Sequence, residues 1–263
     1  MDAPADKPPT ATRFASPGWW VAGGAAGALI AMIGWQQLAP AATPAALPVG
    51  DRAAMEKLVK DTILANPEII PQAITRLQEK EVSKLLASNR EAIEAPFAGA
   101  WIGASDADVV LVEFFDFNCP YCRQSAADVD RLLDEDKKLK VVFRDMPVLG
   151  PDSERFAMAS LSAANQKRYR QFYNSVFQGQ GGLSQERLIR NVRQAGLNEP
   201  QVARDLGSKA LRTEIEKNIS LGRALGLTGT PSYVVGEKIL SGSVGYEALK
   251  QAVDAARKAD KPA

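Results

Sequence analysis

Cys119 and Cys122 are the only two cysteines in this chain of 263 residues, and a proline and a tyrosine stand between them. The apolar run 109–115 comes just before the pair, which predicts that the thiols lie where a buried strand meets the start of a helix. There the first thiol is expected to be exposed and stabilised as a thiolate by the helix N-terminus. The second would lie one turn deeper. This arrangement is typical of thiol–disulfide exchange.

Three other uses of the pair are weaker. An inert or structural disulfide across so small a ring would constrain the unfolded chain very little. A zinc site needs about four ligands, and the chain has no histidine and no third cysteine. Copper(I) accepts soft thiolates. A non-catalytic copper(I)-binding protein that uses both thiolates therefore stays open as an alternative.

The composition excludes several classes of function. Because histidine is absent, catalysis by Ser-His-Asp or Cys-His groups and histidine-ligated haem are ruled out. The 32 basic and 31 acidic residues balance, and no basic block suggests a nucleic-acid partner. No phosphate-binding loop of the Gly-x-x-x-x-Gly-Lys type is present. Thiol–disulfide exchange is compatible with this composition, because it needs neither histidine nor a cofactor.

The segment 19–38 is apolar and predicts a transmembrane anchor. It carries no charged residue from Trp19 through Trp35, and a tryptophan stands at each end of that stretch. Lys7 and Arg13 precede it, which favours a cytoplasmic N-terminus and an exported remainder. A cleaved signal peptide is the main alternative, because small residues follow the segment. A buried core helix is a weaker one. The first two interpretations agree on export.

The rest of the chain divides into a linker, a helical segment and a main domain. Asp51 is expected to cap the first helix, and Asn66-Pro67 interrupts the pattern before a second helix that starts near Pro71. The apolar stripe of these helices would dock on the chain's own domain or on copies of the chain. The predicted organisation is a tail (1–18), an anchor or signal (19–38), a Pro/Ala-rich linker (39–50), a helical segment (51–94) and a main domain (95–263) with a helical insertion at about 151–225.

The main domain is predicted to be α/β. Residues 95–108 look like a junction, and strands are expected at 109–115, 139–144, 231–235 and 238–242. A helix that carries the cysteines follows the first strand, and a terminal helix covers 246–258. The order β-α-β, a helical block and then β-β-α is that of a thioredoxin fold with a helical insertion.

Three separated motifs resemble the DsbA-like thiol–disulfide oxidoreductases. They are the stretch Glu-Phe-Phe-Asp-Phe-Asn-Cys-Pro-Tyr-Cys at 113–122, Arg-Asp-Met-Pro-Val-Leu-Gly at 144–150 and Thr-Gly-Thr-Pro-Ser at 228–232. This resemblance covers about 108–256. The helices around Asn66-Pro67-Glu68 resemble, over a shorter stretch, the suppressor-of-copper-sensitivity protein C branch of that family.

The resemblance implies roles for single residues. Cys119 would be the attacking sulfur and Cys122 the resolving one. Thr230-Pro231 would form a cis-proline loop that holds substrate backbone, and Pro120 and Tyr121 would also face the substrate. Tyr121 could equally be an aromatic that only covers the site.

Glu113 and Asp116 are the two acidic residues near the pair. A charged residue inside an apolar strand is costly unless it is paired or acts as an acid or base. By resemblance Glu113 would relay protons beneath the cysteines, and the alternative is a carboxylate that reaches solvent. Asp116 is expected at the surface, although its position in a loop close to the sulfurs leaves a role at the site open. Arg144 and Asp145 are expected to be structural.

These observations predict an exported thiol–disulfide oxidoreductase that acts as an isomerase or reductase. Its partners would be exported proteins with cysteines, a membrane redox partner that resets the dithiol and, through 51–90, further copies of the chain. It would work at the periplasmic face of the bacterial inner membrane, or in the periplasm if the segment is cleaved. A monomeric DsbA-like dithiol oxidase is the alternative, because potential and partner set the direction.

Overall fold

The structure, a computed structural model, describes residues 49–259, with side chains from Arg52 onward. The chain forms two compact units that meet between Pro67 and Glu68, and each is described by itself. The predicted tail, anchor and most of the linker lie outside the described residues. Among the helices within 49–259, none is both long and apolar enough to cross a membrane.

Two helices precede the main domain. Helix α2 spans Val49–Ala65 and helix α3 spans Ile69–Glu94. The expected N-cap at Asp51 was wrong, because α2 already begins two residues earlier. The break at Asn66-Pro67 is where the sequence predicts it, since a residue before proline disfavours the helical conformation. The second helix starts two residues before Pro71 and ends at Glu94, where the predicted helical segment ends.

The second unit contains a five-stranded sheet in the order β1-β3-β2-β4-β5. Strands β2 (Val109–Phe115) and β3 (Leu139–Asp145) are parallel, and helix α4 (Pro120–Glu135) connects them. The other neighbours are antiparallel, and they involve β1 (Trp101–Gly103), β4 (Ser232–Val235) and β5 (Lys238–Ser241). The α/β thioredoxin fold is therefore confirmed. Strand β1 lies within the segment expected to be only a junction.

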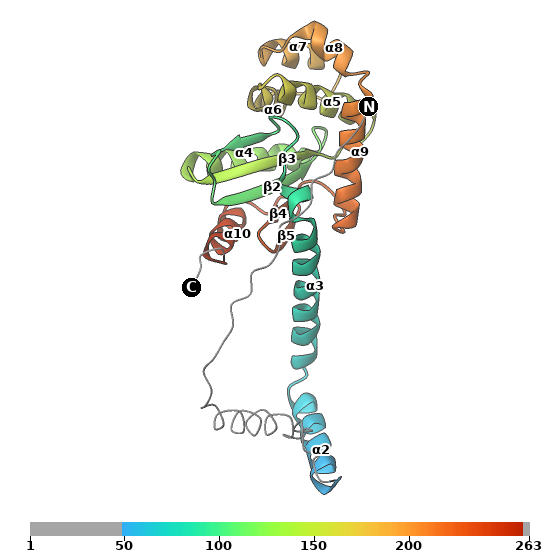
Figure 1. Cartoon of the computed structure of the whole chain (residues 1–263), viewed down its shortest axis with the longest axis vertical. Coiled ribbons are helices and arrows are strands. Elements are labelled where there is room, and N and C mark those ends of the chain that lie inside the picture. Colours follow the sequence, from blue (N-terminus) through green and yellow to red (C-terminus); the bar gives the residue numbers. More distant parts are fainter. Residues whose placement is uncertain (1–48, 260–263) are drawn as a thin grey trace, which may run out of the picture. The chain divides into compact units, whose positions relative to one another are not determined.

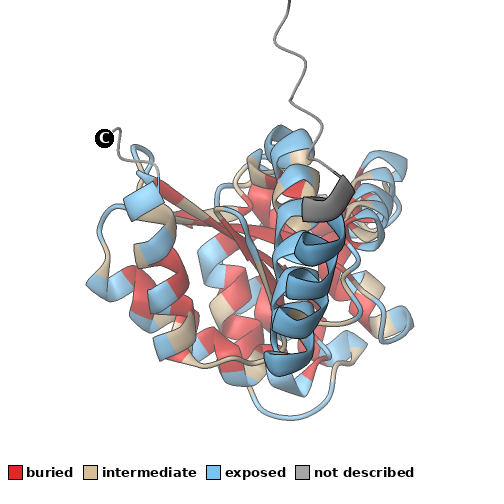
Figure 2. Ribbon diagram, turned by 90° about the horizontal axis from the view of Figure 1, so that it is seen from below, coloured by how far each residue is buried: buried red, intermediate tan, exposed pale blue. Residues whose placement is uncertain are grey.

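Helices cover both faces of this sheet, as Figures 1 and 2 show. Because side chains alternate along a strand, Leu111 and Phe115 of β2 face a core that includes residues of α4 and α10 (Tyr246–Ala259). Val112 and Phe114 face the opposite core, which contains residues of α3 and the end of α9. Glu113 lies two residues from both Leu111 and Phe115, so its side chain points to the same face of the sheet. This is the face that α4 covers.

The helical block between β3 and β4 contains five helices. They are α5 (Pro151–Asn165), α6 (Tyr169–Gln178), α7 (Gln185–Gln194), α8 (Glu199–Asp205) and α9 (Lys209–Ala224). This block occupies the range in which the sequence predicts an insertion. Helix α6 contributes several aromatic rings to the core on the α4 side of the sheet.

The second half of α3 packs on the main domain (95–263). Leu86 and Ile93 are buried with residues of the sheet and of α9, and Val82 and Leu85 pack against the same core. The first half of α3 instead leaves its large apolar side chains exposed, and these are Ile69, Ile70, Ile74 and Leu77. The apolar stripe of α3 therefore docks on the chain's own domain only in its second half. The first half is left free for the other expected partner, a copy of the chain.

Arg144 of β3 fastens the end of α3 to the sheet. Its guanidinium donates to the carbonyl oxygens of Ala92 (2.6 Å), Ile93 (3.2 Å) and Ala95 (2.6 Å). A helix C-terminus leaves such carbonyls without intrahelical partners. The same group donates to Asn218 of α9. Arg144 therefore joins strand β3, the end of helix α3 and helix α9 of the insertion in one buried contact.

We predict that Arg144→Ala destabilises the protein by about 3 kcal/mol or more, because it leaves several buried carbonyl groups without donors. Denaturant unfolding measures the loss, and hydrogen exchange should show faster opening at residues 86–95. Arg90→Ala is the matched control on the same helix. Arg90 is exposed and forms one ion pair with Glu94, so its loss should cost about 0.5 kcal/mol or less. Equal effects of the two variants would contradict the role assigned to Arg144.

Candidate active site

Cys119 is the N-cap residue of α4, with Pro120 at the first helical position. The free N–H groups and the dipole of the first turn therefore lie beside its sulfur. The backbone N–H of Cys119 donates to the Asp116 carbonyl at 3.1 Å, which fixes the residue at the end of the strand. The expectation of an exposed thiol was wrong, because only 5 % of Cys119 is exposed. Its Sγ donates to the carbonyl oxygen of Thr230 at 3.2 Å, and that residue comes from a distant part of the chain.

Cys122 lies about one turn further along α4 and is fully buried. Burial raises the pKa of its thiol far above the ordinary value, and the charge of Glu113 raises it further. The two cysteines are free thiols. Cys122 thus stays protonated at neutral pH, whereas Cys119 stands at the helix start. This difference in position and burial between the two thiols agrees with an attacking Cys119 and a resolving Cys122.

Glu113 is completely buried, so the alternative in which it reaches solvent was wrong. The hydroxyl of Tyr173 donates to its Oε2 at 3.2 Å, and that of Tyr233 donates to its Oε1 at 3.4 Å. Burial raises the pKa of Glu113 to about 8, although the two tyrosine hydrogen bonds act in the opposite direction. A carboxyl group with this pKa can take up or give off a proton near neutral pH.

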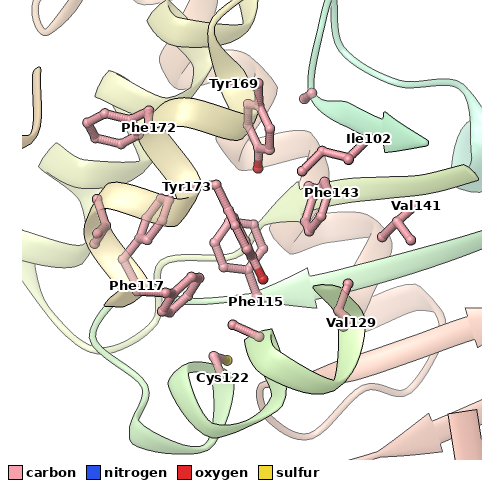
Figure 3. Close-up of a cluster of buried hydrophobic side chains, with 14 of the residues drawn as sticks. Ile102, Phe115, Phe117, Cys122, Val129, Val141, Phe143, Tyr169, Phe172 and Tyr173 are labelled. Carbon is pink, nitrogen blue, oxygen red and sulfur yellow. The ribbon is translucent and has the colours of Figure 1, made fainter. Parts of the chain in front are cut away.

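An aromatic cluster keeps water from Glu113. The ring of Tyr173 lies 4.6 Å from that of Phe143 and 5.5 Å from that of Phe115, measured between centroids. Phe143 is the register partner of Glu113 on β3, and Tyr233 is its partner on β4. Figure 3 shows Phe115, Phe143 and Tyr173 together, with Cys122 nearby on α4. The dry surroundings of Glu113 are therefore built by its neighbours in the sheet and by α6.

The peptide bond between Thr230 and Pro231 is cis, as the resemblance implied. Pro231 accepts a hydrogen bond from the Gly242 N–H at 2.8 Å, which ties the loop to the end of β5. The carbonyl of Thr230 faces Cys119. Of the other residues expected to face substrate, Pro120 is exposed and Tyr121 is 61 % exposed. Pro231 is buried, as Cys119 is, so Pro120 and Tyr121 are the exposed residues of this group.

Asp116 was expected at the surface, and this expectation was wrong. Its side chain is buried and accepts three backbone hydrogen bonds, from Asn118 (2.8 Å), Val148 (2.8 Å) and Leu149 (3.0 Å). The bond to Asn118, two residues on, is a local turn that the sequence order could have suggested. The other two reach the loop after β3. No local pattern reveals them.

Asp145 is a third buried carboxyl group, after Glu113 and Asp116, and the sequence analysis expected it to be structural. Ser160 donates to its Oδ1 at 2.5 Å. Burial raises the pKa of Asp145 to about 8, as it does for Glu113. Within residues 49–259, no group of three or more metal-ligating side chains is present.

Two protein families match this sequence. The family described as Thioredoxin matches residues 97–255, which is more than half of the chain. The family described as Copper resistance protein ScsC N-terminal domain matches residues 51–82. The second match covers α2 and the exposed first half of α3.

Two solved structures are similar. A thioredoxin-like oxidoreductase from Silicibacter pomeroyi is 36 % identical, with a TM-score of 0.62, over 65 % of this chain and 98 % of the other. A linker-deletion mutant of Proteus mirabilis ScsC is 28 % identical, with a TM-score of 0.61, over 82 % of this chain and all of the other.

Curated relatives match over the redox domain. A probable disulfide bond formation protein D from Bacillus anthracis is 30 % identical over 58 % of this chain and 76 % of its own length. A Na(+)/H(+) antiporter NhaA from Herminiimonas arsenicoxydans is 31 % identical over 59 % of this chain, but the match spans only 25 % of the antiporter. The redox domain thus also occurs as a part of much longer proteins.

We predict that Glu113→Gln stabilises the protein increasingly as the pH rises. The folded-state pKa is raised to about 8 from an ordinary value of 4.5. Unfolded wild type therefore releases its proton above about pH 4.5, while the folded protein keeps it until about pH 8. Between these values the wild type loses stability that the glutamine variant keeps, on the order of a few kcal/mol.

Denaturant unfolding at pH 4, 6 and 8 measures this difference. The exposed Glu216 of α9 provides the control, and Glu216→Gln should leave the pH dependence of wild type nearly unchanged. A stability difference between Glu113→Gln and wild type that is the same at pH 4 and pH 8 would show that Glu113 is not held protonated by burial.

Proposed function

We propose, from the premise that this chain belongs to the thioredoxin family, that it exchanges disulfides with cysteines of exported proteins and works as an isomerase or reductase. The observation that carries the proposal is the asymmetry of the two thiols. Cys119 stands at the start of α4 and faces the Thr230 carbonyl, whereas Cys122 is buried and held protonated near Glu113. Such a pair suits an attacking sulfur and a resolving sulfur.

The exchange proceeds in two steps. The Cys119 thiolate attacks a substrate disulfide, so that a bond forms between Cys119 and one substrate sulfur. The bond between the two substrate sulfurs breaks, and the leaving sulfur takes up a proton. Cys122 then attacks Cys119, and the second substrate sulfur is released as a thiol. The substrate is reduced by two electrons, and the protein gains a Cys119–Cys122 disulfide.

Glu113 serves the second step. Cys122 must lose its proton before it can attack, and burial opposes a free thiolate there. A carboxylate at position 113 can take that proton, and a pKa of about 8 leaves part of the population ionised near neutral pH. Tyr173 and Tyr233 hold the carboxyl group in place.

Isomerisation uses the same first step but ends differently. If the thiolate of a third substrate cysteine attacks the substrate sulfur of the mixed disulfide before Cys122 does, a different substrate disulfide forms. Cys119 leaves as a thiolate, and the protein stays reduced. A membrane redox partner that supplies two electrons would reset any protein disulfide that does form. The resemblance to the suppressor-of-copper-sensitivity protein C branch implies this direction, and residues 51–82 match the N-terminal family of that branch. A monomeric dithiol oxidase remains the second candidate, since the same thiols can run in reverse.

The copper(I)-binding alternative is weaker at this site. Copper(I) would need both sulfurs as thiolates. Burial and the charge of Glu113 both disfavour a thiolate at Cys122. Stoichiometric copper binding without exchange would restore that alternative.

Export follows from the sequence of residues 19–38, which lie outside the described part of the chain. We place the redox domain at the periplasmic face of the inner membrane on the basis of that apolar segment and of the two basic residues before it. Cleavage of the segment would leave the domain in the periplasm.

Self-association is proposed through the arm, which we define as residues 51–77. The exposed large apolar side chains on α2 are Met55, Leu58, Val59 and Leu64, and those on α3 are Ile69, Ile70, Ile74 and Leu77. Each of the two helices, taken by itself, thus leaves four large apolar side chains exposed, and such side chains mark an interaction surface. Several active sites in one assembly would raise the local concentration of thiols around a misfolded substrate, which favours isomerisation.

We predict that Cys122→Ala accumulates mixed disulfides with substrate proteins, whereas Cys119→Ala accumulates almost none. Without Cys122 the first step still occurs, but the resolving step cannot. Non-reducing electrophoresis after acid quenching, with a scrambled disulfide protein as substrate, measures the two amounts. Equal trapping by both variants would contradict the assignment of Cys119 as the attacking sulfur.

We predict that a chain beginning at Asp51 sediments as an oligomer at micromolar concentration, while one beginning at Gln78 is a monomer. The shorter chain loses the exposed apolar residues but keeps Leu86 and Ile93, which the core of the redox domain requires. It should lose isomerase activity and retain the capacity to oxidise dithiols. A monomeric longer chain would defeat this hypothesis and favour the monomeric oxidase.

A further inference from the structure

Exposed apolar side chains of the redox domain gather near the cysteines. Among the described residues after α3, four large apolar side chains are exposed, and three of them are Tyr121 (61 %), Val148 (50 %) and Leu149 (47 %). Tyr121 lies between the two cysteines. Val148 and Leu149 belong to the loop between β3 and α5. The fourth, Ile189, is on α7 and is 40 % exposed.

Asp116 holds this loop beside Cys119. Its Oδ2 accepts the N–H groups of Val148 and Leu149, at 2.8 and 3.0 Å, and its Oδ1 accepts the N–H of Asn118. Its own carbonyl accepts the N–H of Cys119 at 3.1 Å. One buried residue therefore links the backbone that presents the exposed pair to the backbone that presents the attacking sulfur.

A carboxylate that accepts three backbone hydrogen bonds holds its partners in a fixed geometry. Without it, two N–H groups of the loop lose their acceptor, and the apolar pair is no longer held at a set position relative to Cys119. Two weaker or more distant ties remain, from the Met146 N–H to the Phe115 carbonyl at 2.8 Å and from the Asn118 amide to the Leu149 carbonyl at 3.5 Å.

We propose that Asp116 is a positioning residue for substrate selection. This inference rests on the proposed function. Asp116 presents Val148 and Leu149 to apolar side chains that flank the reactive cysteine of a substrate. The substrate class is thus disulfides within apolar segments of unfolded proteins. Such segments are buried in native proteins and exposed in misfolded ones. Small hydrophilic disulfides would gain nothing from this surface.

The test compares two peptides with the reduced protein. Each carries one cysteine as a mixed disulfide with glutathione, flanked by leucine and valine in one peptide and by serine and glutamine in the other. Cys119 attacks the mixed disulfide and Cys122 resolves it, so that peptide thiol and glutathione are released and the protein disulfide forms. The readout is the ratio of the two second-order rate constants, apolar over polar. This ratio does not depend on the fraction of active protein.

We expect wild type to prefer the apolar peptide and Asp116→Ala to lower the ratio about tenfold, the size of effect common for the loss of one well-placed contact. The double variant Val148→Ser with Leu149→Ser should lower it similarly. Asp116→Asn should fall between, because its amide oxygen can still accept the loop N–H groups. Ile189→Ser is the matched control, an equally accessible aliphatic residue on α7, and it should keep the wild-type ratio.

Two results would overturn the inference while leaving the proposed function intact. One is a wild-type ratio near one. The other is an Asp116→Ala variant whose two rate constants fall by the same factor, because Asp116 would then act on the thiol chemistry or on folding alone. If wild type exchanges with neither peptide, the proposed function fails together with the inference.

Discussion

The burial of Glu113 beneath a buried thiol is the constraint on which the arrangement of this domain depends. A carboxyl group in an apolar core is costly as an anion, and here its neighbours offer only two tyrosine hydroxyls. The pKa therefore rises to about 8. The sheet places this residue between Phe143 and Tyr233, and α6 closes the cluster with Tyr173. Burial likewise keeps the Cys122 thiol protonated until a base accepts its proton.

Glu113 and Asp116 stand three residues apart and meet opposite environments. Asp116 is also buried, but three backbone N–H groups satisfy it, so it serves as a fixed joint between the strand end and the loop after β3. Glu113 lacks such donors and so retains a proton that it can exchange. Arg144 resembles Asp116 in this respect, because its buried guanidinium donates to backbone carbonyl groups at the end of α3 and pairs with Glu214 at 3.4 Å. Asp116 and Arg144 thus join separate elements of the domain.

Local sequence pattern predicted the parts of this fold that depend on local order. The run 109–115 is a strand because it is apolar on both faces, and the cysteines start a helix because proline follows the first of them. Strand β1 was not predicted, because a strand of three residues is too short to show an alternation of apolar and polar side chains. The partners of Asp116 lie 32 and 33 residues away. The group that covers Cys119 lies 111 residues away. Neither spacing leaves a local signal, so the exposure of both residues was mispredicted.

The reduction potential of the Cys119–Cys122 pair against glutathione tests the central claim most directly, namely that these thiols cycle between dithiol and disulfide. The account predicts one reversible two-electron transition that is lost in either cysteine variant. A midpoint near that of disulfide isomerases, roughly −180 mV, would fit the proposed direction, and one near −120 mV would favour the oxidase. A pair that forms no disulfide at any ratio of oxidised to reduced glutathione would contradict the account.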